Sequence, residues 1–411
     1  MVTEKGEFNL PNGSGGYDKY HLETELAQIA DLGAGGKTVA EAPNLATISG
    51  ILVANAPSHY ERATLPTTAK TTITIQPTWI NIGDSGYVLS EATTLNLADS
   101  ASWDSATYAT AANRAGHDFY IYAVQVADST APGFILSANS TTPTGYTASN
   151  SRKIGGFHCL CVDVGTISGH TLSGYIAGDI LPASVWDLHH RAVSENEGMV
   201  WVPGAQKWVD IYLPSWQNGG MASVYGGTIV DGESTVKING ELAVEYFGLV
   251  GKEVISRSEF MVAMEGSNQG TNIYGSADPG TTGGHKDTNN RRMISNYGVE
   301  DGCGALWQWG RDTYENFYNA GGNATTFKGS YYVADRYYLD GYSWQTKPVY
   351  NSDIESTSKG QCYGLLRRVV LGAYWGNGAD CGSRAAYCAH FSAHRGSSSS
   401  SRGVSSLRRM A

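Results

Sequence analysis

The spacing of hydrophobic and polar positions divides the chain into three parts, and the first is short. In residues 17–33, Leu22, Leu26 and Ile29 recur at spacings of four and three, which predicts one apolar face of a helix that ends near Gly33. A helix with so narrow a stripe does not fold alone. We therefore expect residues 1–65 to pack against copies of themselves, as in a fibre or a trimer.

Residues 66–184 have the alternation that is typical of strands. Three stretches, TTITIQ, YIYAVQV and KIGGFHCLCVDVG, alternate or run apolar, and residues that favour turns separate them. This pattern predicts a β-sandwich. The region contains no cluster of titratable residues, so we expect it to act as a spacer or scaffold.

Residues 185–411 mix the two kinds of pattern. The stretch GMVWVPGAQKWVDIYL (198–213) predicts two strands joined by a turn, and Ser256 with Glu259 predicts a capping box at the start of a short helix. LWQW (306–309) predicts a strand with Trp307 and Trp309 on one face. A few strands and a few helices in one piece predict an α+β, β-rich fold.

Composition and charge exclude several classes of protein. Only 16% of the 411 residues are charged, whereas Gly (51) and Tyr (25) are abundant, which favours strands and turns. The net charge of -10 argues against nucleic-acid binding. The sequence contains no run of 18 apolar residues, so it does not predict membrane insertion. The N-terminal residues lack the pattern of a signal peptide. We expect synthesis in the cytoplasm, with release only by lysis or on a particle.

The six cysteines do not predict a disulfide framework in a chain of this length. Cys159 and Cys161 are expected on one face of a strand, buried as small apolar residues. Paired C-x2-C knuckles are missing, so no cofactor is expected and no metal is indicated, although a structural metal stays possible. Whether Cys381 and Cys388 pair is left open.

The C-terminal part has an unusual composition. From Gly376 to Leu407 the chain contains no Lys, Glu, Gln, Met or Trp, the five residue types whose codons all end in a purine. The segment is small and polar, yet it directly follows LLRRVVLGAYW, which has the pattern of a core strand.

Motifs along the chain resemble one family, the bacteriophage major tropism determinants. They are PTGYTASNSRKIGGFH (143–158), SVWDLHHR (184–191), GMVWVPGAQKWVDIYL, GCGALWQWG (302–310), and LGAYW, GSRAA and RGV near the end. The resemblance implies a C-terminal C-type-lectin fold, of the version shared with formylglycine-generating enzymes, in residues 185–411. It also implies a homotrimer at the tip of a virion tail fibre, joined through residues 1–65 to other tail-fibre proteins. The function implied is binding of a bacterial surface receptor, protein or glycan, to set host tropism.

In this family a retroelement rewrites selected positions by mutagenesis at adenines. Randomised AAC codons become NNC, which encodes none of the five missing residue types. By spacing around Trp375 and Arg384, the resemblance places the variable segment at 374–401. The receptor-binding positions it implies are Tyr374, Gly376, Asn377, Gly378, Asp380, Tyr387, Ala389, His390, His394, Gly396, Ser398 and Ser399. The serine run 397–401 is then one of many sequences that this mutagenesis can produce. The resemblance implies that Trp375, Arg384 and Arg402 form the scaffold of the site.

Several other interpretations are open. The same fold carries a cysteine-dependent oxidase, but its cysteines are five residues apart and Cys381 and Cys388 are seven apart, so we expect no catalytic residues. A host-encoded, surface-displayed diversified lectin is a further alternative, which a secretion signal would favour.

Histidine, tryptophan and arginine residues also have two interpretations each. His390 and His394 have the spacing of a helical zinc pair, but we favour contact residues, and His189–His190 is expected to be structural. Trp201, Trp307, Trp309 and Trp375 are expected mostly in the core instead of forming a sugar-stacking platform. Arg384 and Arg402 are expected to be buried or half-buried, donating to backbone carbonyls.

Overall fold

The computed structural model describes residues 7–11, 17–21, 70–188, 190–315, 366–391 and 396–408. β1 (Glu7–Pro11) pairs antiparallel with β2 (Tyr17–His21) in a two-stranded sheet of their own. The helical interpretation is therefore wrong for Tyr17–His21, where backbone pairing overrides the local spacing. The predicted apolar stripe from Leu22 to Ile29 lies outside the described residues.

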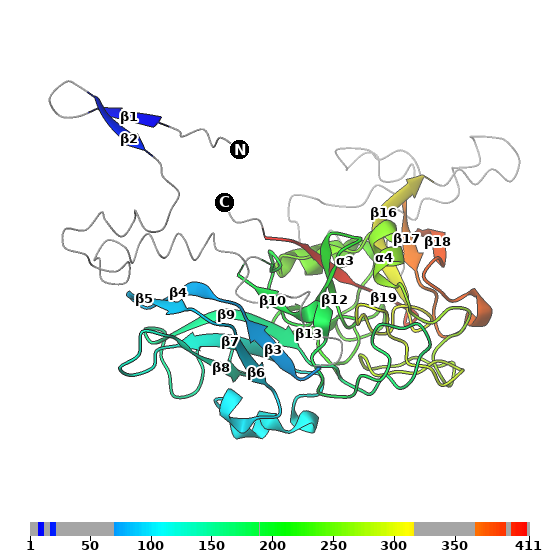
Figure 1. Ribbon diagram of the computed structural model, residues 1–411. Helices are drawn as coiled ribbons and strands as arrows, with labels where there is room; N and C mark the ends of the chain where they lie inside the picture. The colour runs from blue at the N-terminus through cyan, green and yellow to red at the C-terminus, as the bar shows by residue number, and fades with distance from the viewer. Residues whose placement is uncertain are drawn as a thin grey trace, which may run out of the picture.

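The first unit is a β-sandwich-like arrangement at one end of the molecule (Figure 1). A four-stranded antiparallel sheet of order β10-β9-β7-β8 is accompanied by the pairs β3-β6 and β4-β5. Its strands are β3 (Thr72–Ile75), β4 (Thr78–Ile82), β5 (Ser85–Leu89), β6 (Thr93–Asn96), β7 (Asp118–Val124), β8 (Gly133–Ser137), β9 (Ser151–His158) and β10 (Trp186–Asp187). Short 3-10 helices span Ser100–Ser102, Ala106–Ala109, Ala111–Asn113 and Pro182–Ser184.

Strand β7 is buried on both faces. Phe119, Ile121 and Ala123 contribute to a cluster with side chains of β3 to β6, whereas Tyr120 and Tyr122 belong to a cluster on the opposite face with tryptophans of β10 and of the second unit. The alternation of YIYAVQV therefore has period two, as predicted, but both sets of side chains are apolar because both faces are covered.

The second unit holds the helices and two more four-stranded sheets. The sheet orders are β11-β12-β20-β15 and β18-β17-β16-β19, and β13 pairs with β14. The elements are β11 (Met199–Val202), β12 (Lys207–Asp210), β13 (Ser215–Gln217), β14 (Gly220–Ala222), α3 (Gly240–Leu249), β15 (Glu253–Val254), α4 (Arg257–Ala263), β16 (Trp307–Glu315), β17 (Leu366–Leu371), the 3-10 helix Gly378–Asp380, β18 (Ala386–Phe391), β19 (Ser399–Ser401) and β20 (Gly403–Ser406). The described chain is rich in strands and has few helices, as predicted.

Two local predictions in this unit are confirmed. β11 and β12 form the expected antiparallel hairpin, with Met199 opposite Asp210. At the start of α4, the backbone N–H of Glu259 donates to Ser256 Oγ (3.3 Å) and that of Ser256 donates to Glu259 Oε2 (2.8 Å). This reciprocal pair is the capping box read from the sequence.

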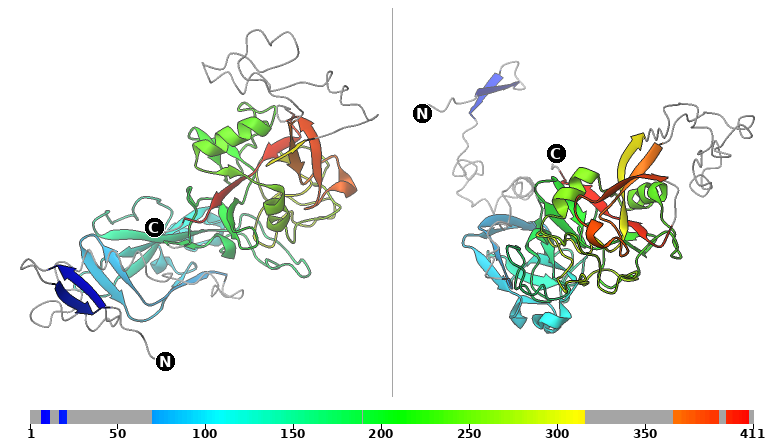
Figure 2. Two further views of the ribbon diagram at one scale, coloured as in Figure 1. Left: turned by 90° about the horizontal axis from the view of Figure 1, so that it is seen from above. Right: turned by 90° about the vertical axis from the view of Figure 1, so that its right-hand side faces the viewer.

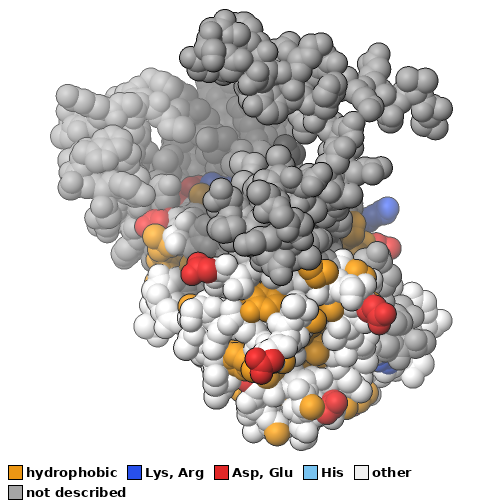
Figure 3. Space-filling model, turned by 60° about the vertical axis from the view of Figure 1, so that its left-hand side comes forward, with side chains coloured by type: hydrophobic (Ala, Val, Ile, Leu, Met, Phe, Trp, Pro, Cys, Tyr) orange, Lys and Arg blue, Asp and Glu red, His pale blue; other side chains and the backbone are white. Residues whose placement is uncertain are grey.

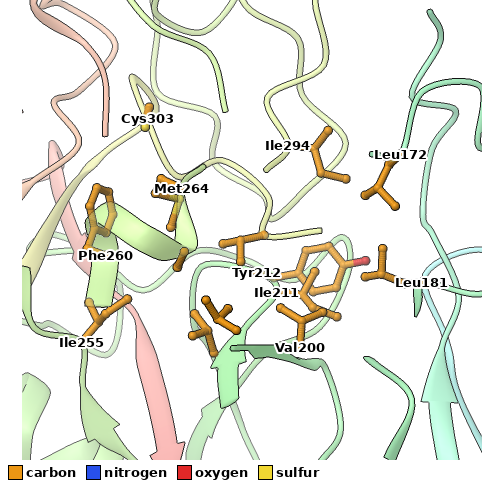
Figure 4. Close-up of a cluster of buried hydrophobic side chains, with 14 of the residues drawn as sticks. Leu172, Leu181, Val200, Ile211, Tyr212, Ile255, Phe260, Met264, Ile294 and Cys303 are labelled. Atoms are coloured by element: carbon orange, nitrogen blue, oxygen red, sulfur yellow. The ribbon is translucent and has the colours of Figure 1, made fainter. Parts of the chain in front are cut away.

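The two units share a hydrophobic core. Figure 4 shows Leu172 and Leu181, from the segment after β9, close to Val200, Ile211 and Tyr212 of the second unit. These side chains belong to one buried cluster that extends to α4 and β17. The packing fixes the first unit against the framework that carries the C-terminal segment.

Polar contacts cross the same junction. His158 Nε2, in the first unit, lies 2.9 Å from Tyr212 Oη of the second. Tyr120 Oη donates to Glu197 Oε1 at 2.5 Å. Because His158, Tyr120 and Tyr212 are buried, these bonds satisfy groups that would otherwise be costly to remove from water.

Cys159 and Cys161 are both buried, as expected, but not on one face of a strand. Strand β9 ends at His158, so the chain turns before the second thiol. Cys159 packs in the core of the first unit and Cys161 in the shared core. The described cysteines, including Cys381 and Cys388, are free thiols.

The views in Figure 2 place β17 and β18 at the end of the molecule away from β4 and β5. On the face in Figure 3, acidic side chains are scattered over the described surface and basic ones are seen only at its edges. In the described ranges, no helix has the length and apolar character needed to cross a membrane.

Candidate receptor-binding surface

The C-terminal segment leaves the core at Gly372, directly after β17. Gly372 has a φ of +86°, and a Cβ there would lie 2.4 Å from the carbonyl oxygen of Gly302. Its N–H donates to the carbonyl of Ala385 (2.9 Å), and its carbonyl accepts from Gly304 N–H (3.0 Å). The loop between β17 and β18 is therefore closed at its base by backbone bonds that no side chain alters.

Residues 305–307 form backbone hydrogen bonds with two separate parts of the C-terminal segment. Tyr374 pairs in parallel with Ala305, whose carbonyl accepts the N–H of Trp375 at 3.0 Å. Two residues further on, the N–H of Trp307 donates to the carbonyl of Ser398 at 2.9 Å. Residues 374–375 and 398, far apart in the loop sequence, are thus attached to one short stretch of framework.

Trp375 anchors the first part. Its half-buried ring packs against a cluster of Leu213, Ile229, Ile273, Met293, Ala305 and Leu306. The side-chain amide of Asn272 donates a hydrogen bond to the Trp375 carbonyl. The ring of Tyr374 meets that of Trp375 edge-on, with centroids 5.1 Å apart.

A polar loop holds the middle of the segment through backbone atoms. Gly270 N–H donates to the Cys381 carbonyl at 2.8 Å. Gln269 Oε1 accepts from Ser383 N–H (3.2 Å), and Gln269 Nε2 donates to Ser383 Oγ (3.3 Å). Sequence reasoning missed Gln269 and Asn272. Their signal was the stretch GSNQGTN, whose amides and glycines are typical of a loop that bonds to other backbone.

The predicted contact residues differ in exposure. Gly376, Asp380 and Tyr387 are exposed, the Tyr387 side chain at 46%. Tyr374, Asn377, Gly378, Gly396 and Ser398 are half-buried, and Asn377 Oδ1 accepts the N–H of Tyr374 (3.1 Å). Ala389 and His390 lie in β18, which is a strand and not a helix. The structure does not describe the side chains of these two residues, and His394 lies outside the described residues.

Ser399 is not a surface residue, so its assignment as a receptor contact is wrong for this chain. Only 4% of its surface is exposed, because β19 pairs in parallel with β16. The neighbouring Ser400 and Ser401 are fully buried, and their hydroxyls donate to the carbonyls of Val230 (2.5 Å) and Trp309 (3.1 Å). The end of the serine run is therefore a core strand.

Arg402 is buried as expected, whereas Arg384 is not. Arg402 is fully buried and donates to three backbone carbonyls, those of Asp210 (2.7 Å), Ile211 (2.9 Å) and Glu300 (2.7 Å), and to Gln308 Oε1 (2.9 Å). Burial lowers the pKa of Arg402 to about 10. Arg384 is exposed in the turn before β18, so its expected burial is wrong; the Gly372–Ala385 backbone bond and the Gln269 side chain hold that turn instead.

The tryptophans fall mainly in the core. Trp309 is fully buried, Trp201 and Trp375 pack against buried clusters, and Trp307 is half-buried. Two of them lie beside predicted contact residues, since the ring centroid of Trp375 is 5.1 Å from that of Tyr374 and the ring centroid of Trp307 is 6.5 Å from that of Tyr387. The four rings do not form a common platform, as expected.

The remaining candidate groups have structural contacts. Burial and the neighbouring Asp380 raise the pKa of Cys381 to about 11, which disfavours a reactive thiolate. His190 Nδ1 lies 3.1 Å from the buried Asp187 Oδ1, in keeping with a structural role, and His189 is outside the described residues.

This geometry defines a class of protein in which a β-rich framework presents an exposed loop from an anchored backbone. Comparison with known proteins identifies the relatives. Residues 63–187 match the family model described as the Mtd second domain. The tail fiber receptor-binding protein of Bordetella phage BPP-1 is 30% identical over 255 residues, which cover 56% of this chain and 63% of that relative.

Solved structures share the fold. The Major Tropism Determinant I1 variant superposes with a TM-score of 0.61 at 22% identity, covering 82% of this chain and 81% of that one. The M1 variant gives a TM-score of 0.60 at 22% identity, with 84% and 83% covered. These superpositions show that the chain shares the C-type-lectin-like fold of the major tropism determinants, as predicted.

Proposed function

We propose that this chain is a phage tail-fibre receptor-binding protein that sets host tropism through the exposed part of residues 374–398. The relationship to a tail fiber receptor-binding protein supports the proposal. The observation that carries it is the separation of roles in the loop. Gly270, Gln269, Asn272 and Ala305 bond to its backbone, so side chains can change without loss of the loop conformation, except at Asn377, whose Oδ1 accepts the N–H of Tyr374.

The contact surface in this proposal comprises Tyr374, Gly376, Asn377, Gly378, Asp380, Tyr387, Gly396 and Ser398, together with Ala389, His390 and His394 from the sequence interpretation. Tyrosine supplies rigid amphipathic area, and Ser, Gly and Asn supply adaptable hydrogen bonds, as in antibody paratopes. A preformed backbone lowers the entropic cost of each new specificity. We further propose that a retroelement diversifies these positions.

The organisation proposed for the whole chain follows from the family. Residues 1–65 form the fibre-attachment and trimerisation region, 66–184 the sandwich, and 185–411 a lectin-fold domain of the formylglycine-generating-enzyme type. Three copies at a fibre tip raise avidity through effective concentration. The protein is then part of the virion, with other tail-fibre proteins and a bacterial receptor as its partners.

The proposal includes no catalytic role. Among the described residues, the cysteines are free thiols and the pKa of Cys381 is raised, and neither observation favours an oxidase.

Binding of purified protein to host cells tests the proposal. Labelled protein should bind the bacterium on which the phage grows and should compete with phage adsorption. Tyr387→Ala should weaken binding about tenfold or more, because exposed tyrosines at the centre of interfaces are frequent hot spots. Val126→Ala, an equally exposed side chain on the first unit, is the matched control and should bind normally. Equal binding by both variants would remove the loop from the receptor site.

A further inference from the structure

A pocket outside the variable segment has no role in the proposal above. It is an open pocket of about 400 Å³ between residues 273–279 and 284–290, within the size range of small-molecule sites. Its lining includes Ile273, which belongs to the same buried cluster against which Trp375 packs. The pocket is therefore built on the framework that anchors the loop, but from residues that the loop does not contain.

The two walls of the pocket are fixed by backbone pairing. Tyr274 N–H donates to the carbonyl of Lys286 at 2.8 Å, and Ile273 pairs with Asp287. The carbonyl of His285 accepts from Met293 N–H (3.0 Å) and from Arg292 Nη1 (2.6 Å). A ligand would meet a preformed cavity and would not have to order these segments.

One wall carries an unusually exposed aromatic ring. Tyr274 is 73% exposed, the highest value among the exposed large hydrophobic side chains of the described residues. A ring in this position, at the rim of a cavity with an apolar floor, offers a flat face on which a ligand can stack while its hydroxyl stays in water.

The opposite wall carries two basic side chains, those of His285 and Lys286. His285 Nδ1 lies 2.8 Å from Oδ2 of the fully buried Asp301, which orients the ring and leaves Nε2 for a ligand. Burial lowers the pKa of His285, but the carboxylates of Asp301 and Glu300 outweigh it, so the net pKa is raised. The side chain of Lys286, which is exposed, lines the same pocket.

We propose that this pocket binds one acidic sugar residue of the hexuronate class. The ring of Tyr274 stacks on the apolar face of the pyranose, and His285 Nε2 and Lys286 Nζ hold the carboxylate. Asp278 and Asn290, at the remaining rim, exchange hydrogen bonds with the sugar hydroxyls. Sugar binding here does not depend on the proposed function; only the source of the sugar, a host surface polysaccharide, rests on it.

Titration of the full-length protein with sodium D-glucuronate, followed by ligand-observed NMR, tests the site. Glucuronate should bind about tenfold or more tightly than D-glucose, because only the acid pairs with the Lys286 ammonium and with the protonated form of His285. Tyr274→Ala and Lys286→Gln should each weaken glucuronate binding about fivefold to tenfold, with unchanged thermal unfolding because both side chains are exposed. The absence of glucuronate binding, equal binding of glucose, or full binding by Tyr274→Ala would each overturn the proposal.

Tyr387→Ala is the matched tyrosine control. It should leave glucuronate binding unchanged while it weakens cell binding, which would show that the pocket and the variable surface are separate sites. If Tyr387→Ala weakens glucuronate binding as much as Tyr274→Ala does, the pocket as described is wrong. Failure of cell binding alone, with glucuronate binding intact, would count against the proposed function and not against this site.

Discussion

Residues 376–380 and residues 399–401 both consist of small, mostly polar residues, but their environments are opposite. The first stretch, GNGAD, forms an exposed to half-buried turn, whereas the second, SSS, is a buried strand with 4% or less of each residue exposed. The difference arises from backbone partners: the first has a 3-10 turn of its own, and the second pairs along β16. Small polar residues therefore do not by themselves indicate a surface.

Serine is tolerated in the buried strand because each fully buried hydroxyl has an acceptor. Ser400 donates to the Val230 carbonyl and Ser401 to the Trp309 carbonyl. An unsatisfied hydroxyl in that place would cost free energy, whereas the same hydroxyl in residues 376–380 would be hydrated. The following predictions test whether the two stretches really differ in this way.

Removal of the Arg402 side chain should have the largest effect. Arg402→Ala leaves three backbone carbonyls and Gln308 Oε1 without donors in the core, so we expect a loss of about 4 kcal/mol in the free energy of unfolding. Denaturant unfolding measures it. Arg384→Ala, at the exposed arginine, is the control and should change stability by less than about 0.5 kcal/mol. Similar losses in both variants would contradict the burial described here.

The thiol of Cys381 should be protected although it directly follows the exposed residues 379–380. Its pKa is raised to about 11, so at pH 8 the thiolate fraction should be about a hundredfold lower than for an ordinary cysteine. Alkylation by iodoacetamide, located by mass spectrometry, should be correspondingly slow in the folded protein and fast after unfolding. The rate should rise toward pH 11, since a raised pKa delays formation of the thiolate. Rapid modification at pH 8 would reopen the oxidase interpretation.

Substitution of the buried serines should have an intermediate effect. Ser400→Ala removes the donor for the Val230 carbonyl and should cost about 1–3 kcal/mol. Ser398→Ala, two residues earlier and half-buried, should cost less than about 0.5 kcal/mol because its contact with Trp307 uses the backbone carbonyl. Thermal unfolding of the two variants under the same conditions gives the comparison, and a larger loss for Ser398→Ala would reverse it.

The smallest effect is expected at Gln269. Gln269→Ala loses two hydrogen bonds to Ser383 near the surface and should destabilise the protein by about 1 kcal/mol. Hydrogen exchange at residues 382–385 should increase, because the turn loses its side-chain support. Gln217→Ala, an exposed glutamine at the end of β13, is the control. Unchanged exchange in the Gln269 variant would mean that backbone bonds alone hold the turn.

Local patterns predicted much of this fold. The hairpin β11–β12 and the capping box of α4 depend on residues close in sequence, and both were read correctly. The burial of Arg402 was also predicted, because a guanidinium with many donors suits a core with unpaired carbonyls.

The failures share a physical cause. Tyr17–His21, Ser399 and Arg384 were misread because the state of each depends on bonds to another segment, which is nearby in sequence for Tyr17–His21 and distant for Ser399 and for the turn that holds Arg384. Composition and spacing carry no information on such partners. Gln269 and Asn272 were missed for the same reason, since they contact a segment about a hundred residues away.

An exchange of loop sequences between two sibling variants of this protein tests the central claim most directly. One chimera exchanges the predicted contact positions from Tyr374 to Ser398 and keeps Ser399–Val404; adsorption of phage carrying it is then measured on the two hosts. The account predicts that host specificity follows the exchanged residues while the midpoint of thermal unfolding stays the same. Specificity that remains with the original host, or that moves only when Ser399–Ser401 are exchanged, would contradict it.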